Sequence, residues 1–340
     1  MRVPPVPLGV ERPTWSVMIP SYDAGDFLAR AIESVLRQAP GPEEMQIEVV
    51  DDCSPEDPGA LVDAIGAGRV ALYRRPVNGG NVANFNTCLE RARGTIVHLL
   101  HADDEVADGF YRTLERPLLE EEGVGAAFCR FVAISEDGRP LKHARPERET
   151  PGVIEGWLRT IARGQRLQPP AIAVRRDVYE RVGGFDVRVD RYAEDWEMWV
   201  RIAAATKVWY DPAPLALYRV HSGSISGRQL RTGANVRILR AAIELNRAHF
   251  EPEEGDVVAR EALRTTAVTA LRRGGRLLRR GDSEAMWAQL REALRSDRSP
   301  GVLARATGLL ALRAFWPVLR PAWPALRAVR ARARGLRAES

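Results

Sequence analysis

The chain has 340 residues, of which 45% are apolar and 28% are charged, and its net charge is +5. These values are typical of one or two folded domains and exclude collagen-like, disordered and disulfide-rich proteins. Its three cysteines, Cys53, Cys88 and Cys129, include no CxxC pair, so we expect neither a zinc site nor a disulfide framework, and a reducing compartment fits best.

The charge is unevenly distributed along the chain. Residues 226–340 hold 23 arginines, no lysine and 11 acidic residues, a net +12, whereas residues 1–225 carry −7. This asymmetry indicates two parts with different partners. No apolar run of signal-peptide length occurs at the start, and residues 301–326 are interrupted by three arginines and three prolines. We therefore expect no secretory signal and no membrane-spanning helix.

The first half of the chain alternates strand-like and helix-like patterns. Apolar runs predict strands at 15–21, 46–51, 69–74 and 95–100, and apolar residues at helical spacing predict helices over 27–36 and 81–92. This alternation predicts an α/β fold, with a mostly parallel sheet flanked by helices.

The second half of the chain is less regular. We expect residues 125–225 to mix short strands and loops with a helix that begins near Glu194. From about residue 228 the pattern is helical, with breaks expected at Gly274-Gly275, Gly281 and Pro300. Asp282 is expected to cap one of these helices.

Polar clusters follow three of the predicted strands: Ser21-Tyr22-Asp23, Asp51-Asp52 and Asp103-Asp104. Ligands of open α/β sheets bind beyond the carboxyl ends of the strands, so we expect these clusters to converge on one site. Asp103-Asp104 suits a hard divalent cation, and the alternative is a helix cap or turn. Asp51-Asp52 can accept hydrogen bonds from a nucleobase or ribose, or can form a turn.

Other segments carry weaker indications of function. The turn Asn78-Gly79-Gly80-Asn81 allows close backbone approach to a phosphate or sugar, but it matches neither a Walker A loop nor GxGxxG, which disfavours kinases and dinucleotide enzymes. Asp195, at the start of a predicted helix, can accept a proton from a hydroxyl, or has only a local role there. His221 is a candidate metal ligand or a local hydrogen-bonding group, and Arg219 can pair with a phosphate.

The C-terminal region contains arginines at 305, 313, 320, 327 and 334. This spacing places them near one helical face, which either lies on an anionic membrane or is an ordinary exposed face. No nucleic-acid-binding module is present, so nucleic acid is not an expected partner.

The order of these motifs is more specific than any of them alone. The chain contains, in sequence, VMIPSYDAGDFLARAIESVLRQ, IEVVDDCSPED, NGGNVANFN, LLHADDE, VGGFD with EDWEMW, and YRVHSGSIS. This order closely resembles family 2 glycosyltransferases over residues 14–226 or so. The resemblance leaves residues 1–13 as an N-terminal extension and 227–340 as an arginine-rich helical region.

The resemblance implies the GT-A fold, a Rossmann-like nucleotide-binding sheet. It also implies inverting transfer of a sugar from a nucleotide-diphosphate donor, with Mg²⁺ or Mn²⁺, to a saccharide, lipid-linked or protein acceptor. Asp195 matches the general base, and Asp104 and His221 match metal-site positions. The residues that match donor-binding positions are Pro20, Tyr22, Asp23, Asp52, Asn78, Gly80, Asn86, Asp103 and Asp104.

Two residues depart from the family pattern. His101 stands where an aspartate is common, which removes one carboxylate, and Asp23 replaces an asparagine. The competing hypotheses are a nucleotidyltransferase that makes a nucleotide sugar and a non-catalytic sugar- or membrane-binding module. The expected location is the cytoplasm, with the inner face of the membrane as the site of peripheral attachment through the C-terminal region.

Overall fold

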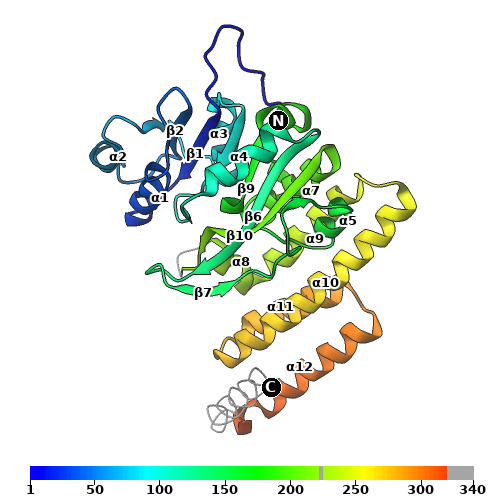
Figure 1. Cartoon of the computed structure of the whole chain (residues 1–340). Helices are drawn as coiled ribbons and strands as arrows, with labels where there is room; N and C mark the ends of the chain where they lie inside the picture. The colour runs from blue at the N-terminus through cyan, green and yellow to red at the C-terminus, as the bar shows by residue number, and fades with distance from the viewer. Residues whose placement is uncertain (222–224, 320–340) are drawn as a thin grey trace, which may run out of the picture. The chain divides into compact units, whose positions relative to one another are not determined.

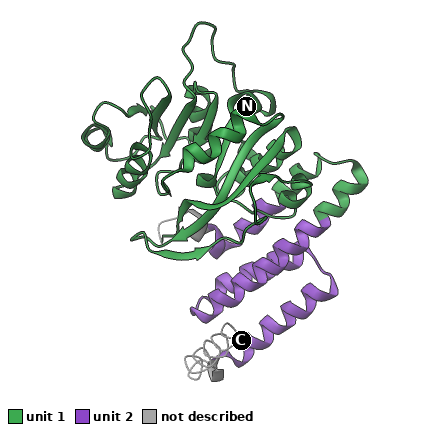
Figure 2. Ribbon diagram, viewed as in Figure 1, with its two compact units in different colours: residues 1–227, 241–259 green, residues 228–240, 260–340 purple. Residues whose placement is uncertain are grey.

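The computed structural model describes residues 1–221 and 225–319. Ser222 and Ser224 of the YRVHSGSIS motif, and Arg320, Arg327 and Arg334, lie outside the described residues. The chain forms two compact units, residues 1–227 with 241–259 and residues 228–240 with 260–340 (Figure 2). The finer division into an extension, a catalytic domain ending at 226 and a C-terminal region stays a prediction.

The first unit is built on one sheet of ten strands among the described residues. The strand order is β3-β2-β1-β4-β9-β6-β10-β5, with β7 beside β6 and β8 beside β10 (Figure 1). The strands are β1 (Trp15–Ser21), β2 (Met45–Asp51), β3 (Ala71–Arg74), β4 (Ile96–Leu99), β5 (Glu105–Val106), β6 (Val124–Ile134), β7 (Pro140–His143), β8 (Gly152–Val153), β9 (Ile172–Arg175) and β10 (Lys207–Arg219).

Helices follow or separate these strands, which confirms the predicted α/β class. They are α1 (Asp26–Leu36), α2 (Gly59–Gly66), α3 (Asn81–Arg91), α4 (Phe110–Glu120), α5 (Trp157–Ala162), α6 (Arg176–Val182) and α7 (Glu194–Ala205), with short 3₁₀ turns at Pro169–Ala171 and Val187–Val189. The four predicted strands of the first half form within two residues of their expected limits, and all four pair in parallel.

Strand β1 lies inside the parallel part of the sheet, between β2 and β4, and is covered on both faces. All seven of its residues are buried. Gly94 lets the turn before β4 approach β1, since a Cβ at this position would lie 2.5 Å from the Ser16 backbone nitrogen. Helix α1 buries Leu28, Ala31, Ile32 and Val35 in the same core.

The middle of the chain differs from its prediction. Strands β6 and β10, expected to be short, have 11 and 13 residues and pair in parallel. The pairing has register shifts around Asp211, Pro214 and Ala216, because prolines cannot donate to a strand ladder. These shifts and the small residues of β6 interrupt the sequence periodicity without ending the strands.

The chain continues as α8 (Ile225–Thr232), α9 (Ala234–Arg247), α10 (Pro252–Arg279), α11 (Ser283–Ser296) and α12 (Pro300–Leu319). Asp282 caps α11 as predicted, accepting a hydrogen bond from Ala285 N at 3.0 Å. The expected break at Gly274-Gly275 is wrong, because α10 runs through it. A Cβ at Gly274 would lie 3.3 Å from Leu309 Cδ2, so glycine there permits close helix packing. No helix within 1–221 or 225–319 is long and apolar enough to cross a membrane.

Candidate active site

The three polar clusters meet at the carboxyl ends of β1, β2 and β4, as predicted. Ser21 lies opposite Asp51 in the β1–β2 pairing, and Asp52 N donates to the Ser21 carbonyl at 2.9 Å. On the other side of β1, Ala102 N donates to the Pro20 carbonyl at 3.3 Å. Parallel pairing to a shared central strand therefore brings together, at the carboxyl ends of the strands, segments that are separated by about 80 residues in the sequence.

The turn after β1 presents polar groups to solvent. Pro20 is buried, Tyr22 is 52% exposed, and Asp23 is exposed with a φ of 51°. This left-handed conformation is tolerated better by aspartate than by most residues. Asp23 N donates to Ser54 Oγ at 2.9 Å, which fixes the turn to the segment after β2.

The two aspartates after β2 organise neighbouring loops. Asp51 is fully buried and accepts from Ser54 N at 3.0 Å. The Asp52 carboxylate accepts from Gly79 N at 3.0 Å and Gly80 N at 2.8 Å and pairs with Arg75. Asp52 thus fixes the glycine-bearing turn before α3.

Gly80 has a φ of 82°, a conformation that favours glycine. Asn78, in the same turn, is exposed.

Two asparagines of α3, by contrast, are buried. Asn84, which the sequence analysis did not identify, donates to the Val50 carbonyl at 3.0 Å. Asn86 donates to the Phe185 carbonyl at 3.1 Å and accepts from Phe185 N at 2.8 Å, so its amide fixes the turn after α6.

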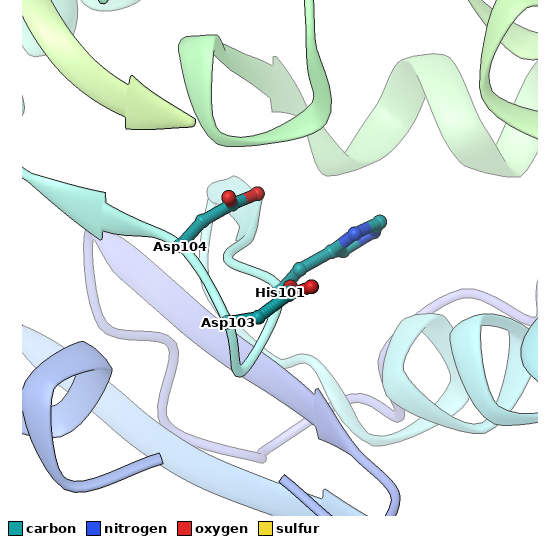
Figure 3. A group of neighbouring side chains, drawn as sticks. All are labelled: His101, Asp103 and Asp104. Carbon is teal, nitrogen blue, oxygen red and sulfur yellow. The ribbon is translucent and has the colours of Figure 1, made fainter. Parts of the chain in front are cut away.

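The acidic turn after β4 carries His101, Asp103 and Asp104, which form a candidate metal-binding group. One potential ligand atom from each lies within 4.8 Å of the others. Figure 3 shows the three side chains leaving one turn and pointing to the same side of it. His101 stacks on Phe85, with ring centroids 4.9 Å apart. His101, expected only to remove one carboxylate from the motif, thus has its imidazole among the candidate ligands.

Asp104 is the most buried member of this group, at 1% exposed. Its Oδ1 accepts from Arg219 N at 2.8 Å, while Oδ2 is buried without a hydrogen-bond partner among the described residues. Burial, and then the charge of Asp103, raise the pKa of Asp104 well above its usual range. An unpartnered buried carboxylate oxygen beside a second carboxylate and an imidazole fits a divalent cation.

The structure does not support the phosphate-pairing role considered for Arg219. Its side chain is 2% exposed, and its guanidinium donates to the Asp103, Ser135 and Glu136 carbonyls at 2.9–3.0 Å and pairs with Glu105. His221 lies beside this turn, with Nε2 at 3.0 Å from Asp103 Oδ2. His221 therefore contacts the acidic turn through Asp103.

Helix α7 begins at Glu194 as predicted and carries two adjacent carboxyl groups in its first turn. Burial, and then the charge of Asp195, raise the pKa of Glu194 to about 8. Burial raises the pKa of Asp195 to about 6, although hydrogen bonds from Trp196 N and Gln165 oppose this shift. Gln165 Nε2 lies 2.5 Å from Asp195 Oδ2. No sequence pattern identified Gln165, because it is thirty residues from Asp195.

Tyr218 lies on β10, and its phenol has a raised pKa. Burial raises the pKa of its phenol, and the charges of Asp104, Asp103 and Asp195 raise it further. The start of α7 also contacts the start of α3, where Asn81 Nδ2 lies 3.5 Å from Glu194 Oε1.

Comparison with known proteins identifies the class of protein that this fold and site define. Residues 16–183 match the model of glycosyl transferase family 2. The glycosyltransferase TuaG of Bacillus subtilis, whose name assigns it to teichuronic acid biosynthesis, is 33% identical over 181 residues, covering 49% of this chain and 70% of TuaG. The chain therefore belongs to glycosyltransferase family 2 and is a glycosyltransferase.

Solved structures share the fold at low sequence identity. TarS residues 1–349 of S. aureus, in complex with UDP-GlcNAc, has a TM-score of 0.65 and 15% identity, covering 92% of each chain. The mannosyltransferase PcManGT of Pyrobaculum calidifontis, in complex with GDP-Man and Mn²⁺, has a TM-score of 0.56 and 18% identity, covering 91% of this chain and 84% of that one. The expected GT-A class is thus confirmed.

Replacing Asn86 with alanine should destabilise the fold. The change leaves the buried N–H and carbonyl of Phe185 unpaired, so we expect the free energy of unfolding to fall by about 2–4 kcal/mol, measured by chemical denaturation. Asn78→Ala is the matched control, because Asn78 is exposed in the preceding turn. Equal stability of the two variants would contradict this role for Asn86.

Proposed function

We propose that this glycosyltransferase moves a sugar, with inversion, from a nucleotide-diphosphate donor to a hydroxyl acceptor. The observation that carries this proposal is the buried Asp104 Oδ2, which has no hydrogen-bond partner among the described residues and lies in one group with Asp103 and His101. Inverting displacement requires a base for the incoming hydroxyl and stabilisation of the leaving diphosphate. The nucleotide-sugar complexes of TarS and PcManGT support this donor class. Family membership favours this reaction over the nucleotidyltransferase and non-catalytic alternatives.

The donor nucleotide is proposed to lie along the ends of β1 and β2. Tyr22 and Asp23 are exposed there, and Asn78 and Gly80 lie in the turn fixed by Asp52. Pro20 and Asn86 are buried, so their contribution is to shape the adjoining turns. The side chain of Asp52 is already bound by backbone N–H groups, which favours an indirect role through the glycine turn.

Asp104, Asp103 and His101 are the residues proposed to hold Mg²⁺ or Mn²⁺, with His221 positioning Asp103. A cation bound there would supply positive charge to the leaving diphosphate. The unpartnered Oδ2 of Asp104 is the main support for this assignment. PcManGT, solved with Mn²⁺, supports the cation class.

Asp195 is proposed as the general base. With a pKa of about 6 it is ionised at pH 7, while Glu194, with a pKa of about 8, remains protonated. Neighbouring carboxyl groups whose pKa values are pushed apart are typical of acid–base sites. As the acceptor oxygen attacks the anomeric carbon and the bond to the diphosphate breaks, the hydroxyl proton passes to the Asp195 carboxylate.

The acceptor is proposed to be a growing saccharide of a cell-envelope polysaccharide. The name of TuaG, which links that relative to teichuronic acid, supports this class. Free Cys53, Cys88 and Cys129 fit a reducing location, so we propose that the protein acts in the cytoplasm. Attachment to the inner face of the membrane stays a separate prediction.

Replacing Asp195 with asparagine should lower the transfer rate by about 10²–10⁴-fold, because the general base is lost. Radiolabelled sugar transfer measures the rate, and stabilisation of the protein by the donor shows that binding persists. Glu194→Gln is the matched control, since the native side chain is already neutral at pH 7. Near-native turnover by the Asp195 variant would contradict the assignment.

Replacing Asp104 with asparagine should remove the stabilisation that Mn²⁺ adds to nucleotide binding. The amide can still accept from Arg219 N, and a buried negative charge is removed, so the unliganded variant should unfold at no lower a temperature than wild type. Thermal unfolding with UDP or GDP, with and without Mn²⁺, tests both expectations. An unchanged Mn²⁺-dependent increase in unfolding temperature would show that Asp104 does not bind the cation.

The transfer rate should rise as pH increases through about 6, where Asp195 becomes ionised. Gln165→Leu should shift this rise to higher pH, because the amide hydrogen bond stabilises the ionised carboxylate and lowers its pKa. Gln168→Leu is the control from the same loop. The rate profile from pH 5 to 9 provides the measurement, and superimposable profiles for the two variants would refute a role for Gln165.

A further inference from the structure

Helix α12 in the second unit has one face packed against its own unit. Val302, Ala306 and Leu309 are 1%, 5% and 6% exposed and belong to the apolar core of this unit. The close approach of Leu309 to Gly274 joins α12 to α10. The inner face of α12 is thus buried by packing within its own unit.

The opposite face of α12 is apolar and exposed. Leu303, Leu310 and Phe315 are 45%, 39% and 63% exposed. The exposed residues between 302 and 316 other than arginine are Leu303, Ala304, Thr307, Gly308, Leu310, Ala311, Ala314 and Phe315. Eight of the ten exposed residues in this range are therefore uncharged, and the other two are Arg305 and Arg313. A largely uncharged exposed face is typical of a helix that contacts another apolar surface.

Positive charge borders this face. Arg305 and Arg313 are exposed on the same helix, and Arg313 lies 5.3 Å from the Trp287 ring centroid. At helical spacing both arginines lie near the edges of the buried face, so they flank the uncharged face. Residues 300–340 as a whole contain eight arginines and one acidic residue, Glu339.

We propose that the uncharged face of α12 is a lipid-binding surface that attaches the enzyme to an anionic membrane. An interfacial helix buries apolar side chains at the boundary between headgroups and acyl chains, while nearby arginines bind lipid phosphates. The charge of residues 300–340 is complementary to anionic lipid and would repel a second copy of the same region. The arginine spacing left open whether their face lies on an anionic membrane or is an ordinary exposed face. In the structure the exposed face of α12 carries Leu303, Leu310 and Phe315, and Arg305 and Arg313 lie beside it.

This inference does not depend on the catalytic assignment, because the residues concerned lie outside the proposed active site. The test is co-sedimentation of the full-length protein with vesicles of phosphatidylglycerol and phosphatidylcholine, or of phosphatidylcholine alone. We expect binding to the anionic vesicles that weakens as salt is raised. The double substitution Leu310→Glu with Phe315→Glu should weaken that binding at least tenfold, which is about 1.4 kcal/mol.

A control for added negative charge is Leu119→Glu on α4, which places one such carboxylate at a leucine that is 48% exposed in the first unit. It should bind vesicles as wild type does, and so should the Asp195→Asn variant, which separates attachment from catalysis. Circular dichroism and thermal unfolding verify that the double variant folds. If it does not, the neutral changes Leu303→Gln and Phe315→Ser replace it one at a time, and each should weaken binding to the anionic vesicles.

Two outcomes would overturn the proposal. The first is equal binding of wild type and the α12 variants to anionic vesicles. The second is a wild-type dimer in light scattering that the double variant converts to a monomer, with no vesicle binding by either, which would make the face a contact between two copies.

Discussion

The buried guanidinium of Arg219 holds the acidic turn, and the geometry of the site depends on it. Its donors bind the carbonyl of Asp103 and two carbonyls after β6, while its backbone N–H binds the Asp104 carboxylate. One residue at the end of β10 thus connects β4, β5 and β6. A planar guanidinium with five donors can satisfy several acceptors at once, which lysine cannot do.

This use of Arg219 has an electrostatic consequence. Its guanidinium donates to carbonyl groups and pairs with Glu105, while Asp104 Oδ2 stays buried without a hydrogen-bond partner among the described residues. Burial also raises the pKa of the Asp195 carboxyl group, and the hydrogen bond from the Gln165 amide partly opposes this shift. Keeping these carboxyl groups buried costs free energy. Groups with such perturbed pKa values occur most often at functional sites.

Prediction from sequence succeeded where local patterns carry the information. The strands at 15–21 and 46–51 are continuous apolar runs, and the polar residues after them fall at strand ends by simple counting. It failed at β6 and β10, where prolines and small residues hide long strands whose stability comes from pairing with each other. It also failed at Gly274-Gly275, because a glycine pair that weakens an isolated helix is favoured where another helix packs closely.

The sequence by itself determined the family, the α/β class and the convergence of the three polar clusters that follow β1, β2 and β4. The family follows from the order of the motifs, and the convergence follows from the rule for parallel strands. Only the tertiary structure decided what each side chain contacts. In the structure Arg219 is a buried positioning group, His101 lies among the candidate metal ligands, and Gln165 donates a hydrogen bond to Asp195. Such pairings depend on long-range packing, which brings together residues that no local periodicity connects.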